Sequence, residues 1–97
     1  MDTYKFVGKI SVKARHLPSS QIVETTILFE ERDDSIYYCW TFNDSFGKLI
    51  ASKCLPISYG IINTDKFDFA INHSKYSIDH YRIDRQKIFE VTEIQKL

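Results

Sequence analysis

Apolar and polar residues alternate along residues 3–14. One face of this stretch carries Tyr4, Phe6, Gly8, Ile10 and Val12, and the other carries Lys5, Val7, Lys9, Ser11 and Lys13. A period of two is typical of a strand that buries one face. Residues 15–20 contain Pro18 and two serines and predict a loop, after which residues 21–30 predict a second strand.

A hairpin that places Val12 opposite Val23 puts the apolar residues of both strands on one face. The same register sets Lys5 opposite Glu30 and Ser11 opposite Glu24 on the other face. Because apolar residues meet apolar ones and opposite charges meet, we predict this register for the pair. Glycine at position 8 leaves room for a bulky neighbour or marks a bend.

A stretch rich in aromatic residues, Ser-Ile-Tyr-Tyr-Cys-Trp-Thr-Phe, follows at residues 35–42. A four-residue connection at 31–34 joins it to the second strand and predicts that Ile36 lies opposite Phe29. Continuing the same parity points Tyr38, Trp40 and Phe42 to the inner face. The first three strands are therefore predicted to form an antiparallel meander.

The second half of the chain gives less regular patterns. Phe46, Leu49, Ile50, Lys53 and Cys54 recur at helical spacing, so we predict a short helix at residues 45–54 that Pro56 ends. Short alternating stretches predict strands at 57–62, 66–72, 75–83 and 87–94, with turns at 63–65, 72–74 and 84–86. The predicted fold is mainly β, on the border of α+β: a single domain over residues 1–97, forming a small antiparallel barrel or sandwich of about seven strands.

Composition limits the classes of function. The chain has 97 residues, and its 13 basic and 13 acidic side chains cancel, so no overall field attracts nucleic acid or an anionic membrane. It has neither a long apolar run nor a signal-peptide pattern, which predicts no membrane segment and a cytoplasmic location. Cys39 and Cys54 are too few for a disulfide scaffold and lack Cys-x-x-Cys spacing, so we expect both to be reduced and buried.

Three histidine and aspartate residues are candidates for a catalytic or metal site. Asp68, Asp79 and His80 could together hold a divalent metal or activate water. The alternative is that they are solvated or hydrogen-bonded strand residues, and adjacent residues such as Asp79 and His80 point to opposite faces of a strand. The cysteines and histidines also lack zinc-ligand spacing. We therefore expect no catalytic residues, no metal and no cofactor.

Lysines line the outer face of the first strand. Lys5, Lys9 and Lys13 near exposed rings such as Tyr37 or Tyr81 would suit single-stranded nucleic acid, with phosphates on the lysines and bases on the rings. The predicted register instead gives Lys5 and Lys9 acidic neighbours, and lysines on outer faces keep sheets soluble. Nucleic acid is therefore the less favoured partner.

The outer face of the predicted meander is less polar than a face in water should be. It carries a semi-apolar strip made of Val7, Leu28, Tyr37 and Cys39, with Thr41 beside it. Either the predicted helix at 45–54 covers this strip, which is the favoured interpretation, or another protein does.

We therefore expect a small non-catalytic module that binds another protein, of the inhibitor, immunity or accessory type, from a phage or bacterium. Homodimerisation through a strand edge or the strip is a further expectation. The alternative is a small β-barrel that binds single-stranded nucleic acid or a small ligand. A third hypothesis is a small metal-dependent hydrolase or nuclease.

Overall fold

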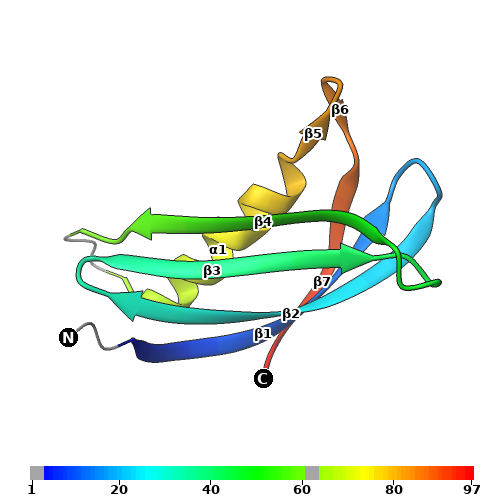
Figure 1. Cartoon of the computed structure of the whole chain (residues 1–97). Helices are drawn as coiled ribbons and strands as arrows, with labels where there is room; N and C mark the ends of the chain where they lie inside the picture. Colours follow the sequence, from blue (N-terminus) through cyan, green and yellow to red (C-terminus); the bar gives the residue numbers. More distant parts are fainter. Residues whose placement is uncertain (1–3, 61–63) are drawn as a thin grey trace.

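The computed structural model describes residues 4–60 and 64–97, which form one five-stranded antiparallel sheet with a helix on one face (Figure 1). The elements in chain order are β1 (Lys5–His16), β2 (Gln21–Arg32), β3 (Ser35–Asn43), β4 (Leu49–Ser58), α1 (Lys66–Asp79), β5 (Arg82–Ile83), β6 (Gln86–Lys87) and β7 (Phe89–Lys96). The strand order in the large sheet is β4-β3-β2-β1-β7, while β5 and β6 form a separate two-stranded ribbon. The mainly β fold is confirmed, but the sheet stays open and is not closed into a barrel.

The strands β1 and β2 form the predicted hairpin in a register shifted by two residues. Val12 lies opposite Thr25, and Ala14 takes the predicted place of Val12 opposite Val23. A shift by two keeps every side chain on the same face, because side chains alternate with a period of two. From Gly8 onward the apolar pattern therefore predicted the faces of the hairpin correctly and the partners wrongly.

The turn from β2 to β3 is shorter than predicted. It consists of Asp33 and Asp34, with Asp33 in the left-handed region at φ 55°, and it sets Glu31 opposite Ile36. Aspartate tolerates this conformation better than most residues, and two-residue turns of this kind match the twist of a hairpin. The three-strand meander itself is confirmed.

The predicted helix at 45–54 is wrong, because this segment forms a turn followed by the edge strand β4. The Asp44 carboxylate accepts hydrogen bonds from the backbone N–H groups of Phe46 and Lys48, and Gly47 adopts φ 80°. The returning strand then pairs with β3 along its whole length. Pairing with β3 satisfies the backbone hydrogen-bonding groups of this segment and buries Ala51 and Ile57. These contacts stabilise the strand more than the helical spacing of apolar residues would stabilise a helix.

The predicted strands at 66–72 and 75–83, with the turn at 72–74, are wrong, because residues 66–79 form α1. The Asp65 carboxylate caps the helix by accepting from the backbone N–H groups of Phe67 and Asp68, at 2.8 and 3.1 Å. The buried face of the helix consists of Ala70, Ser74, Ser77 and Ile78. Three of these four residues are small, which lets the helix lie close to the sheet.

The remaining predictions concern the ends of β4 and β7. The predicted strand 57–62 survives only as the last residues of β4, and residues 61–63, which include part of the predicted turn 63–65, lie outside the described part of the chain. The last predicted strand, 87–94, corresponds to β7, which pairs antiparallel with β1. The turn at 84–86 is confirmed as the short turn at Asp84 and Arg85, both with positive φ.

The core lies between the sheet and α1. The sheet contributes the inward residues of β1, β2 and β3, together with Phe89 of β7, which is fully buried. Trp40 lies at the centre of an aromatic cluster with Phe42, Tyr81 and Phe89. The predicted inward set Ile36, Tyr38, Trp40 and Phe42 is buried as expected.

Replacing Gly8 by alanine is expected to destabilise the protein by about 1–3 kcal/mol, the usual cost of overpacking a core. A Cβ at position 8 would come within 2.4–2.6 Å of the Phe67 ring, which also packs edge-on against Phe29. Urea unfolding of G8A measures the loss. The double variant G8A/F67L should lose less than the sum of the two single variants; strict additivity would show that the Phe67 ring is not what the new methyl group meets.

Candidate functional site

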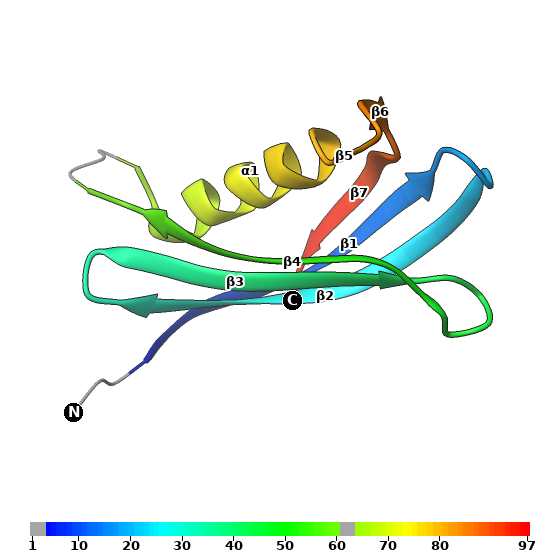
Figure 2. The ribbon, with the colours of Figure 1, turned by 45° about the horizontal axis from the view of Figure 1, so that its top comes forward.

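The two faces of the large sheet differ in what covers them. The helix α1 and the ribbon β5–β6 lie over one face, and no described helix or strand lies over the other (Figure 2). We call the uncovered side the open face. The helix that was expected to cover it does not form, and α1 packs on the opposite side, where Phe67 contacts Phe29 and His73 contacts Tyr38.

A β-bulge in β1 determines which residues of this strand reach the open face. Phe6 lies opposite Glu30 while Gly8 lies opposite Phe29, so Val7 is an extra residue in β1. As a result Val7 packs against the core and leaves the predicted strip, whereas Phe6 shares the face of Glu30. The prediction for these two residues is therefore reversed.

An exposed apolar cluster, here called the open-face patch, occupies one end of this face. Its members are Tyr4, Phe6, Leu28, Tyr37, Pro56 and the Cys39–Cys54 pair. The side chains of Tyr4, Phe6, Leu28 and Tyr37 are 51%, 65%, 42% and 37% exposed. Of the predicted strip, Leu28, Tyr37 and Cys39 belong to the patch, and Thr41 is exposed beside it as expected.

Polar groups frame the open-face patch. The Arg32 guanidinium donates a hydrogen bond to the Tyr4 hydroxyl at 3.1 Å and lies 5.5 Å from the centre of the same ring. The Tyr4 ring meets Tyr37 edge-on, with ring centres 6.5 Å apart. A shallow hollow of about 300 Å³ lies beside these rings and is lined by Thr26, Leu28, Glu30, Tyr37, Tyr38 and Cys39. The rim of the patch thus carries an acidic side chain, Glu30, and a basic one, Arg32.

The two cysteines form a disulfide between β3 and β4, so the prediction that both are reduced and buried is wrong. Cys39 and Cys54 lie directly opposite each other, with their Cα atoms 4.0 Å apart. Both are exposed on the open face. Sequence reasoning missed the pair because it placed Cys54 on a helix, where it has no fixed relation to Cys39.

Of the predicted basic stripe, Lys9 and Lys13 remain on the open face and Lys5 leaves it. The bulge places Lys5 opposite Glu31 and off the open face, and Lys9 lies opposite Leu28. Lys13 lies opposite Glu24 and is 3.5 Å from the Glu93 carboxylate. Lys9 and Lys13 therefore share the open face with apolar or acidic cross-strand neighbours, and the stripe that would follow a nucleic-acid backbone has lost Lys5.

A hydrogen-bonded pair joins the sheet to α1 at the edge of the core. The Tyr38 hydroxyl and His73 Nδ1 are 2.7 Å apart, and the two rings meet edge-on. Burial, partly offset by a hydrogen bond with the Ser77 hydroxyl, raises the pKa of Tyr38 to about 12. Burial and the nearby positive charge of Lys53 lower the pKa of His73. The pair is therefore neutral at pH 7 and fastens the helix to β3.

The stability of the protein is expected to fall as the pH drops below about 6.5, the ordinary pKa of histidine. The pKa of His73 is lower in the folded than in the unfolded chain, so the unfolded chain binds the proton first. The stabilising contribution is present above the unfolded value and is lost as the pH falls toward the folded one. Urea unfolding across this window measures the slope, which H73Q should reduce; a slope that H73Q leaves unchanged would contradict the assignment to His73.

The suspected acidic cluster does not converge. Asp68 and Asp79 lie eleven residues apart on α1, which corresponds to roughly 16 Å along a helix axis. Asp68 pairs with Lys96, Asp79 accepts from the Val91 N–H, and the His80 ring contacts the Tyr76 carbonyl. Among the residues that the structure describes, no group of three metal-ligating side chains comes together.

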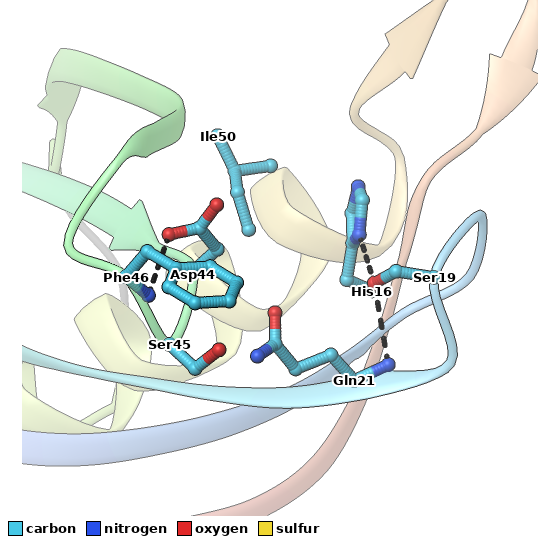
Figure 3. A pocket seen from close by; sticks show the side chains of 7 residues that line it. All are labelled: His16, Ser19, Gln21, Asp44, Ser45, Phe46 and Ile50. Atoms are coloured by element: carbon cyan, nitrogen blue, oxygen red, sulfur yellow. Dashed lines mark hydrogen bonds between the residues drawn. The ribbon is translucent and has the colours of Figure 1, made fainter.

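A second hollow, of about 380 Å³, lies at the far end of the sheet between the β1–β2 and β3–β4 loops (Figure 3). It is lined by His16, Ser19, Gln21, Asp44, Ser45, Phe46 and Ile50. His16 Nδ1 lies 2.6 Å from Ser19 Oγ, which also accepts from the Gln21 N–H. These bonds and those of Asp44 shape the two loops, and Phe46 stands 94% exposed at the tip.

The chain was compared with protein-family models, curated proteins and solved structures, and none of them matches. No helix in the described ranges has both the length and the apolar character needed to cross a membrane. The interpretation of the site therefore depends on its own geometry.

Proposed function

We propose that this chain is a small non-catalytic binding module that contacts another protein through the open face of its sheet. The observation that carries the proposal is the open-face patch, which has no cover in the described chain. An antiparallel sheet with one face in water should be polar there, and a contiguous exposed apolar patch is typical of an interaction site.

The residue types of the patch support the same proposal. Tyrosine and arginine are enriched among the residues that dominate binding energy at interfaces, and Tyr4, Tyr37 and Arg32 lie together here. Glu30 and Arg32 supply opposite charges at the rim, where polar contacts set orientation more than affinity. Tyr37 stands on β3 between two paired strands, and the Tyr4 ring is held by Arg32 and Tyr37, so little conformational entropy is lost when the rings bind.

An inhibitor, immunity or accessory protein works through such a contact, and we extend the proposal to this class. A cytoplasmic location stays a prediction, and the disulfide argues against it, because reducing compartments disfavour disulfides. The patch is equally compatible with a second copy of the chain as the partner, which the experiment below distinguishes.

Replacing Leu28 by arginine should weaken partner binding by at least about tenfold, which corresponds to 1.4 kcal/mol. The wild-type chain, L28R and the control I83R are immobilised and exposed to host lysate, and the retained proteins are identified and then titrated as purified species. Leu28 and Ile83 have similar exposure, 42% and 45%, but Ile83 lies in the β5–β6 ribbon. Sedimentation of all three chains shows whether the partner is a second copy.

The proposal requires that wild type and I83R retain the same protein and that L28R loses it. Equal retention by L28R would show that binding does not use the open face. Retention that nuclease treatment abolishes would favour the nucleic-acid alternative instead.

A further inference from the structure

We infer that the Cys39–Cys54 disulfide is a site of thiol–disulfide exchange with a dithiol protein of the Cys-x-x-Cys class, and that the attack falls on the sulfur of Cys54. This inference does not rest on the proposed function. It follows from where the disulfide lies in the sheet.

The disulfide is within reach of a large reagent. Both cysteines are exposed, and they lie on the face that neither α1 nor the β5–β6 ribbon covers. The neighbouring pairs on the same face of β3 and β4 are Thr41 with Ser52 and Tyr37 with Pro56, and most of these residues are exposed as well. A disulfide in a core would exchange only after unfolding, whereas this one requires no opening of the fold.

The direction of attack follows from the strand order. A thiolate must approach a disulfide along the line of its two sulfurs, from the side opposite the sulfur that leaves. Behind Cys39 lies β2, whose Leu28 and Thr26 line a hollow together with Cys39. Behind Cys54 lies no further strand of the described ranges, because β4 is the edge of the sheet. The approach to Cys54 is therefore open past the edge of the sheet, whereas a protein thiol that approaches Cys39 must pass over β2 and enter the shallow hollow between its side chains.

The exchange proceeds in two displacements. The first thiolate of the dithiol protein attacks Cys54 Sγ, forms a mixed disulfide and releases Cys39 as a thiolate. The second thiolate of that protein then attacks its own partner sulfur in the mixed disulfide and releases Cys54. Two electrons and two protons pass from the dithiol to this chain, which ends with two free thiols while the other protein ends with a disulfide.

Reduction leaves β4 attached by its backbone pairing with β3 and by its buried side chains Ala51 and Ile57, without a covalent link. The strand pairs with β3 and with no other strand, and Cys39–Cys54 is the one covalent link across that pair among the described residues. The exchange site therefore controls how firmly the edge strand is held next to the open-face patch.

The test uses the oxidised full-length chain and a thioredoxin-type protein whose second active-site cysteine is replaced by serine, so that the mixed disulfide is trapped. The reaction runs without denaturant, is quenched with acid, and the freed thiol is alkylated. Cleavage after lysine and arginine separates the two sulfurs, since Cys39 falls in the peptide 33–48 and Cys54 in 54–66. The variant C39S/C54S is the matched control and should trap nothing.

The expected result is a mixed disulfide on the Cys54 peptide and an alkylated Cys39 peptide, formed at a rate that low urea does not change. Trapping mainly on Cys39, or on both sulfurs equally, would overturn the inferred direction of attack. A reaction that occurs only when urea begins to unfold the chain would overturn the exchange site itself.

Discussion

Replacing Trp40 by alanine is expected to lower the free energy of unfolding by about 3–5 kcal/mol, the range for deleting a large buried ring. Trp40 is 1% exposed, and its ring contacts Phe42, Tyr81 and Phe89 with centroid distances of 5.5, 5.4 and 6.1 Å. Its Nε1 donates to Ser77 Oγ at 3.4 Å, so the substitution also removes one hydrogen bond of a buried hydroxyl. Urea unfolding followed by circular dichroism measures the loss.

Two further variants keep this prediction testable. T41A changes the next residue of β3, which is exposed on the open face, and should shift stability by no more than about 0.5 kcal/mol. W40F retains part of the ring contacts and should lie between wild type and W40A, which matters if W40A does not fold. A W40A protein as stable as T41A would contradict the placement of Trp40 at the centre of the core.

Removing the disulfide in C39S/C54S is expected to cost about 3 kcal/mol, the value for a closed loop of about 15 residues. The two cysteines are 15 residues apart in sequence, and both are exposed, so serine at these positions leaves no cavity. The loss comes from the greater freedom of the unfolded chain. Chemical unfolding of the oxidised wild type and of the double variant measures the difference.

The control for this prediction is T41A/S52A, which changes the adjacent pair on the same strands and face. It should leave stability nearly unchanged, since neither residue is buried and no covalent link is lost. Reduced wild type should behave like C39S/C54S. If oxidised and reduced wild type unfold at the same urea concentration, the disulfide does not constrain the unfolded chain.

The faces of the first three strands were predictable from sequence, and their register was not. Side-chain direction alternates residue by residue, so Tyr38 and Trp40 had to point opposite to Cys39 and Thr41. A shift by two residues preserves that alternation, and the register between β2 and β3 was decided by the tight turn at Asp33 and Asp34. The bulge beside Gly8 then placed Phe6, and not Val7, on the open face. The sequence predicts a bend or a bulky neighbour at this glycine, but not its effect on the two residues before it.

The second half of the chain was misassigned because its local patterns are ambiguous. Residues 49–54 have helical spacing yet form a strand, because their backbone pairs with β3 and Cys54 forms a disulfide with Cys39. Residues 66–79 alternate in short pieces yet form a helix, since Asp65 caps it and the small residues Ala70 and Ser74 let it dock. In both segments tertiary contacts outweighed a weak local preference.

The sequence by itself determined that this protein is a mainly β domain with an aromatic central strand and a semi-apolar outer surface. These properties follow from side-chain alternation and composition, which are local. Only the tertiary structure decided that the helix covers the inner face, that the outer face stays open, and that Cys39 and Cys54 meet on it. Those outcomes depend on contacts between residues far apart in the chain. The relative energies of such contacts cannot be predicted from a short sequence pattern.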